Sequence, residues 1–124
     1  MPASRRRLGA FGESVAHAYL LRQGYTVLAT GWRCAIGELD IVAQDAEGLV
    51  FIEVRTKKGE ALLSPEESVT PSKQHKLIAL AQTYLESEQI EPDRNWRIDV
   101  IAIVVGKTGK VERLTHTKYA VGEF

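Results

Sequence analysis

The sequence predicts one α/β domain, in which a mixed β-sheet is flanked by helices in the order α-β-β-β-α-β-β. Three observations support this class: apolar residues recur at helical spacing near the start, two β-rich runs are joined by a short turn, and a long helical segment separates two later strands. A crossover of that length suits parallel neighbouring strands. The 124 residues, 44% of them hydrophobic, suffice for one core and leave no room for a second domain of ordinary size.

The first helix is expected over about residues 7–23, and Gly24 ends it in the usual C-terminal position. Small residues, among them Gly12 and Ala16, form a stripe along this helix that would let its backbone lie close to a sheet. Glu13 interrupts the stripe. Residues 1–6, before the helix, are expected to form a flexible basic arm of the single domain 1–124.

The rest of the chain reads as five strands and one more helix. Thr70 is suited to cap the second helix and Pro71 to occupy its first position, while Pro92 limits its end. The expected strands are at about 25–33, 37–44, 49–56, 96–105 and 111–117.

Residues 45–48 form a turn, so the second and third strands should make a hairpin in which paired positions sum to 93. Asp40 then lies opposite Glu53, and Glu38 lies opposite Arg55. One face of this hairpin is charged at its far end, and the other is apolar from Leu39 onward and belongs to the core. The Cβ atoms of opposed residues are about 4.5–5.5 Å apart, so the two carboxylates would repel unless a cation neutralises them. Hard oxygen ligands favour Mg²⁺ or Mn²⁺.

A plainer interpretation of this face is surface ion pairing, with Glu38 and Arg55 as one pair. Overall charge is balanced, with 16 basic and 16 acidic residues, which excludes a domain that is basic throughout but not a local basic patch. Lys73 and Lys76 share a face of the second helix, and these lysines fit phosphate contact or simple solvation equally well. The same two interpretations apply to Arg5, Arg6 and Arg7 at the N-terminus.

The segments GELDIV (37–42) and LVFIEVRTK (49–57) resemble the YraN family of small bacterial proteins. This family is grouped with restriction-endonuclease-like nucleases and Holliday-junction resolvases, whose pattern is Asp on one strand and Glu-x-Lys on the next. The resemblance covers nearly the whole chain and implies a restriction-endonuclease-like core. It also includes Gly9, Gly12-Glu13, Ala16, Tyr19-Leu20, Gly24-Tyr25, Trp32-Arg33, Lys73 and Arg97-Ile98-Asp99.

The resemblance implies that Asp40 and Glu53 are metal ligands, with the Val54 carbonyl as a third candidate. It also implies that Glu13 approaches the metal; the alternative is an acid favoured by the helix dipole. Supporting positions beside the ligands are expected for Glu38 and Asp99; for Asp99, a structural ion pair with Arg97 is the other interpretation.

The chain departs from the family pattern at Arg55, where lysine is usual. Arginine stays charged and offers a rigid donor fork, whereas lysine can orient or deprotonate water. Lys57 has the right parity but lies about 6.5 Å further along the strand. Arg55 and Lys57 are thus both candidate catalytic residues, and Lys73 is the leading lysine from elsewhere that could substitute.

The expected function is a Mg²⁺- or Mn²⁺-dependent endonuclease that hydrolyses DNA phosphodiesters, with branched DNA as one candidate substrate. A non-catalytic nucleic-acid-binding module and a protein-interaction domain with a vestigial site are the alternatives. With one cysteine and no apolar run of about 18 residues, a cytoplasmic protein without a membrane span is expected. Resolvase-like relatives often form dimers, so a homodimer is one expected assembly.

Overall fold

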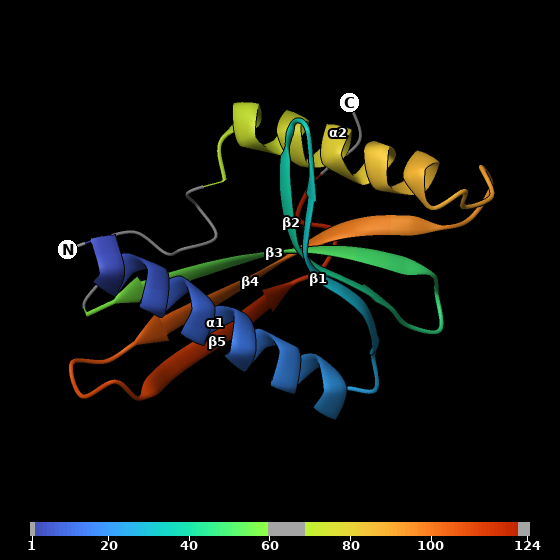
Figure 1. Ribbon diagram of the computed structural model, residues 1–124. Coiled ribbons are helices and arrows are strands. Elements are labelled where there is room, and N and C mark those ends of the chain that lie inside the picture. Colours follow the sequence, from blue (N-terminus) through green and yellow to red (C-terminus); the bar gives the residue numbers. More distant parts are fainter. Residues whose placement is uncertain (1, 60–68, 122–124) are drawn as a thin grey trace.

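The computed structural model describes residues 2–59 and 69–121, with side chains from Arg6 onward. Two helices and five strands follow the predicted order (Figure 1). The elements are α1 (Pro2–Arg22), β1 (Thr26–Cys34), β2 (Gly37–Gln44), β3 (Leu49–Lys58), α2 (Pro71–Ser87), β4 (Trp96–Val105) and β5 (Val111–Thr117).

The five strands form one mixed sheet in the order β1-β2-β3-β4-β5. Strands β3 and β4 are parallel, and the other neighbouring pairs are antiparallel. Helix α2 provides the crossover between the parallel strands and covers one face of the sheet, whereas α1 covers the other (Figure 1). The predicted α/β architecture is thus confirmed, and it is consistent with a restriction-endonuclease-like core.

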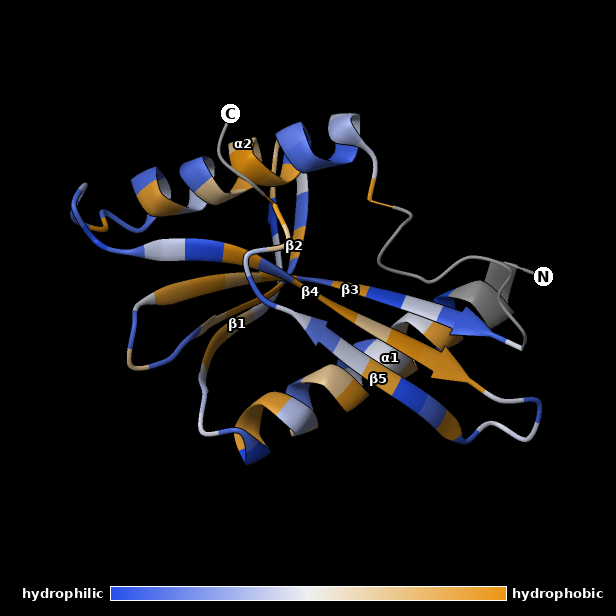
Figure 2. Ribbon diagram, turned by 180° about the vertical axis from the view of Figure 1, so that it is seen from behind, coloured by the Kyte–Doolittle hydropathy of each residue, from blue (hydrophilic) through white to orange (hydrophobic). Residues whose placement is uncertain are grey.

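Each helix buries its own hydrophobic cluster against the sheet. Ala16 and Leu20 of α1 pack with residues such as Ile52, and Leu80 of α2 packs with residues such as Phe51 on the opposite face. Both faces are therefore buried in the centre, and β4 is hydrophobic along most of its length (Figure 2).

Leu39 departs from the expected alternation along β2. The hairpin pattern predicts that it shares a face with Ile41, but Leu39 packs in the α2 cluster and Ile41 in the α1 cluster. The β1–β2 hairpin rises toward α2 beyond the end of the β2–β3 pairing (Figure 1), so Leu39 turns to the other helix. Asp40 lies between Leu39 and Ile41, directly before the first position at which β2 pairs with β3.

The element boundaries differ from expectation mainly at the N-terminus. Helix α1 begins at Pro2, so residues 2–6 belong to a helix rather than to a separate arm. The start of α2 is as predicted: the Thr70 side chain accepts a hydrogen bond of 3.2 Å from the Lys73 amide, and Pro71 follows the cap. Within the described residues, neither helix is long and apolar enough to cross a membrane.

Candidate metal site

The candidate site lies where β2 separates from β3. The two strands pair only over Ile41–Gln44 and Leu49–Ile52, in the predicted register in which positions sum to 93. Beyond this ladder, β2 continues to pair with β1, and β3 continues to pair with β4. Asp40 and Glu53 are the first residues past the separation point, so their side chains occupy the fork between two diverging strands.

The Asp40 carboxyl group takes the place of the missing ladder bond. Its Oδ2 atom accepts a 2.8 Å hydrogen bond from the Val54 amide. Burial and the nearby charge of Glu53, with smaller contributions from a hydrogen bond to Glu53 and from the charge of Glu13, raise the pKa of Asp40 to about 8 against the lowering effect of the Val54 amide. A carboxyl group whose pKa lies above 7 retains its proton at neutral pH, so Asp40 is protonated there.

Two cations converge on the other carboxylate of the pair. The Glu53 side chain is only 6% exposed, and its Oε2 atom lies 3.2 Å from Lys73 Nζ and 3.6 Å from Arg55 Nη1. Lys73 belongs to α2, whereas Arg55 follows Glu53 on β3, so the charge of one buried oxygen is balanced from two elements. The resemblance had suggested Lys73 as a substitute lysine, and the structure brings it to the acidic pair.

Glu13 approaches the pair from the opposite helix. Gly12 makes this approach possible, because a Cβ atom at that position would collide with the Thr56 hydroxyl of β3. Burial, followed by the charges of Glu38 and Glu53, raises the pKa of Glu13. Nevertheless, in the part of the chain that the structure describes, no group of three or more acidic, histidine or cysteine side chains could hold one metal ion together. In this arrangement α1 brings Glu13 within electrostatic reach of Asp40 and Glu53, and its role as a third metal ligand stays a prediction.

Two facing carboxylates are still a sufficient protein ligand set for magnesium. Mg²⁺ keeps several water molecules and is usually bound through one or two carboxylates, whereas structural zinc needs four protein ligands. Asp40 uses Oδ2 for the Val54 amide and retains Oδ1, and both residues carry the hard oxygen donors that Mg²⁺ or Mn²⁺ prefers. Burial and then the nearby charge of Glu53 raise the pKa of Asp40, and a divalent cation would relieve the repulsion between the two carboxylates.

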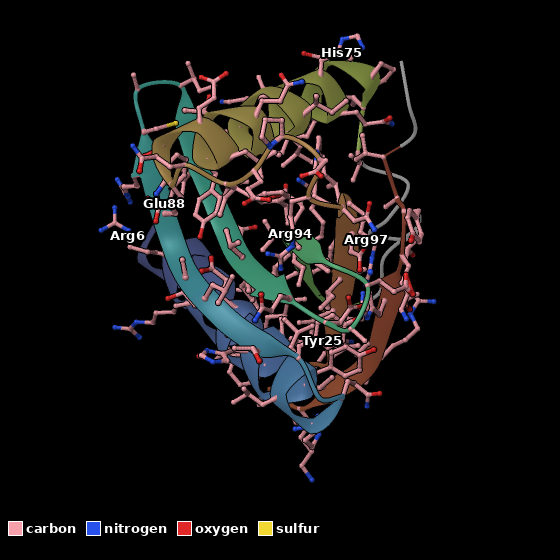
Figure 3. All side chains as sticks on the ribbon, turned by 90° about the vertical axis from the view of Figure 1, so that its right-hand side faces the viewer. Arg6, Tyr25, His75, Glu88, Arg94 and Arg97 are labelled. Carbon is pink, nitrogen blue, oxygen red and sulfur yellow. The ribbon has the colours of Figure 1, made fainter. Side chains whose placement is uncertain are left out.

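The remaining predicted site residues are more dispersed. Glu38 pairs with Arg33 at 3.3 Å, and the ladder that would set it opposite Arg55 ends before this position, so the predicted Glu38–Arg55 pair is not formed. Lys76 lies against the β1–β2 turn, with Cε 3.1 Å from where a Cβ of Gly37 would be. The other basic residues do not gather on the pair: Lys57, Arg6 and Arg7 are exposed, Arg6 at the periphery of the molecule (Figure 3), and the side chain of Arg5 is outside the described residues.

Asp99 does not support the candidate metal site. It is fully buried on the α1 face, where its carboxylate accepts from Arg97 Nε at 3.0 Å and lies 2.7 Å from His116 Nε2. Arg97 also donates to the Tyr25 hydroxyl at 3.0 Å (Figure 3), and its Nη1 atom lies 3.0 Å from Asp45 Oδ2. Asp99 thus belongs to the structural ion pair that was the other interpretation, because its place on β4 turns its side chain away from α2.

Sequence reasoning did not predict the full network of hydrogen bonds and ion pairs around Asp99. His116 Nδ1 lies 2.9 Å from the Tyr19 hydroxyl, so the network links α1 to β4 and β5. One feature of the sequence could have predicted the contact between His116 and Asp99. The antiparallel β4–β5 hairpin pairs Ile101 with His116, which brings the histidine near Asp99 two residues away.

Comparison with known proteins gives a consistent result. Residues 12–103, which include the whole acidic pair and α2, match the model of a family described as "Uncharacterised protein family UPF0102". The chain is 46% identical over 123 residues to a UPF0102 protein of Roseiflexus castenholzii and 45% identical over 123 residues to one of Chloroflexus aurantiacus; each match covers 99% of both chains. A UPF0102 protein of Desulforamulus reducens is 43% identical over 122 residues, covering 98% of this chain and 100% of its own. The chain therefore belongs to the UPF0102 family, to which the YraN resemblance pointed.

Proposed function

We propose that this protein is a metal-dependent endonuclease that hydrolyses DNA phosphodiester bonds, with branched DNA as a candidate substrate. One observation carries the proposal: Asp40 and Glu53 meet at the strand fork, are mutually repulsive, and have cationic side chains beside them. Structural ion pairs also perturb pKa values, but this pair combines burial, like charge and neighbouring cations, which is the pattern of a functional site.

Asp40 and Glu53 would hold the divalent cation. When bound, that cation would act as a Lewis acid on a phosphoryl oxygen and favour an attacking water. Arg55 presents a planar guanidinium beside the pair, suited to a phosphate oxygen of the DNA backbone. Lys73 brings a second positive charge from the opposite element, so a phosphate entering the fork would meet donors from both β3 and α2.

The decisive experiment is cleavage of linear, nicked and four-way DNA with Mg²⁺ or Mn²⁺. Asp40→Asn keeps the shape and the acceptor for the Val54 amide but removes the ligand charge, so we expect cleavage to fall by at least about 100-fold, since even residues that only orient metal ligands cost 10–100-fold. Asp93→Asn, a similar change at an exposed position, is the matched control. Unchanged cleavage by Asp40→Asn, or no metal-dependent cleavage of any substrate by the wild type, would refute the proposal.

A second candidate function is a nucleic-acid-binding module without catalysis. Arginine at position 55, where lysine is usual in nuclease patterns, favours it, because a guanidinium does not deprotonate water. This alternative predicts DNA binding that weakens steeply with salt and needs no divalent cation. The homodimer and the cytoplasmic location stay predictions from the sequence.

A further inference from the structure

Lys73 makes the shortest ion pair to the acidic pair, and it comes from an element that the metal ligands do not share. Its Nζ atom lies 3.2 Å from Glu53 Oε2, while the Glu53 side chain is 6% exposed and that of Lys73 is 36% exposed. A buried carboxylate thus depends on a cation whose own side chain reaches solvent. The oxygen that Lys73 contacts is also one that a divalent cation would need.

The two cations on this oxygen are held differently. Arg55 is two residues from Glu53 on β3, so the strand keeps it beside the pair at 3.6 Å. The backbone of Lys73 is fixed at the start of α2, where its amide donates to the Thr70 hydroxyl. Its flexible four-carbon chain extends from that fixed point, so the ammonium group can leave Glu53 without any movement of the helix.

We propose that Lys73 competes with the divalent cation for Glu53 and that, once displaced, its ammonium group contacts a phosphate of the bound DNA. This inference rests on the proposed function, since it requires both a metal at the acidic pair and DNA at the fork. The lysine then has two alternating partners of the same charge: the Glu53 carboxylate without the divalent cation, and the DNA backbone with it. Metal binding and DNA binding are coupled through one side chain.

The competition predicts that removing the lysine charge tightens metal binding. In calorimetric titrations with Mn²⁺ and no DNA, Lys73→Gln should bind about three- to tenfold more tightly than the wild type, as expected for a partly exposed ion pair. Lys76→Gln removes the same charge one turn further along α2, where the side chain lies against Gly37, and should stay within about twofold of the wild type. Thermal unfolding of both variants checks that the fold is retained.

The displacement of Lys73 from Glu53 predicts a phosphate contact that depends on the divalent cation. With Ca²⁺, which allows binding without turnover, Lys73→Gln should lower the salt dependence of DNA binding by about one phosphate contact relative to the wild type. In EDTA the two proteins should show the same salt dependence, because Lys73 is then engaged by Glu53. A merely structural lysine would not produce this difference.

The outcomes separate this inference from the proposed function. If the wild type does not bind Mn²⁺, both are refuted. If the wild type binds Mn²⁺ and cleaves DNA but Lys73→Gln binds Mn²⁺ no more tightly than Lys76→Gln, only the inference is refuted. The same conclusion follows if Lys73→Gln changes the salt dependence equally in Ca²⁺ and in EDTA.

Discussion

Replacing Asp40 by asparagine removes one ionisable carboxyl group from a buried acidic pair and leaves its hydrogen bonds possible. The asparagine oxygen can accept from the Val54 amide, and its NH₂ group can donate to Glu53 as the protonated carboxyl does. The variant therefore isolates the cost of ionising Asp40 from the loss of a contact. We expect it to change how stability depends on pH.

The sign and size follow from the pKa of Asp40, which is about 8 in the folded protein against an ordinary value of 3.8. Between these values the folded protein retains a proton that the unfolded chain has lost. The free energy of unfolding must then fall as pH rises, by about 1.4 kcal/mol per pH unit, until the slope vanishes above the folded pKa. Because Asp40 is partly exposed, we expect the wild type to lose about 1–2 kcal/mol from this group between pH 6 and pH 8.

Urea unfolding at pH 6, 7 and 8 in EDTA, followed by tryptophan fluorescence, measures this loss. Asp40→Asn should lack it and should be more stable than the wild type at pH 8, whereas Asp93→Asn, at an exposed position, should follow the wild type. Saturating Mg²⁺ should restore stability to the wild type at pH 8, since binding to the folded state alone is stabilising. Equal pH slopes for the wild type and Asp40→Asn would show that folding does not raise the pKa of Asp40.

Two further substitutions test how the surrounding elements are held. Gly12→Ala should lower the free energy of unfolding by about 1–3 kcal/mol, because its methyl group collides with the Thr56 hydroxyl. In the double variant, Thr56→Ala should recover part of that loss. Strictly additive free energies from urea unfolding would contradict the collision. Asp99→Ala should lower the free energy of unfolding by about 3–5 kcal/mol, because it leaves Arg97 buried with one fewer acidic partner. Its Mn²⁺ affinity, measured by calorimetry, should stay within about twofold of the wild type. A larger change in affinity would place Asp99 in the metal site.

Local sequence patterns determined most of the fold. Alternation and turn chemistry gave the β2–β3 register, since a slip of one residue would exchange the two faces. The small-residue stripe on the first helix predicted its close packing, which the contact of Gly12 with Thr56 confirms. The Thr70-Pro71 pair placed the start of α2. Each of these features depends on residues close in sequence or paired across one short turn.

The candidate site was only partly predictable, because some of its contacts join residues that are distant in the sequence. Asp40 and Glu53 could be paired from the hairpin, but the end of the ladder at Ile41 could not, because it depends on how the β1–β2 hairpin bends toward α2. Nor could the sequence exclude Asp99, which shares a strand with many core residues. Its side chain faces α1 and meets His116 from another hairpin.

The fold class, the strand register and the two opposed carboxylates could be predicted from the residues alone, because these follow from periodicity and from one tight turn. The charges that surround that pair depend instead on how the helices and strands pack together. Lys73 reaches Glu53 from a helix 20 residues further along the chain, and Glu38 pairs with Arg33 rather than with Arg55. Such partners depend on how a helix docks over a sheet and where two strands diverge. The distances from Lys73 to Glu53 and from Arg33 to Glu38 result from this packing, and no local sequence pattern encodes them.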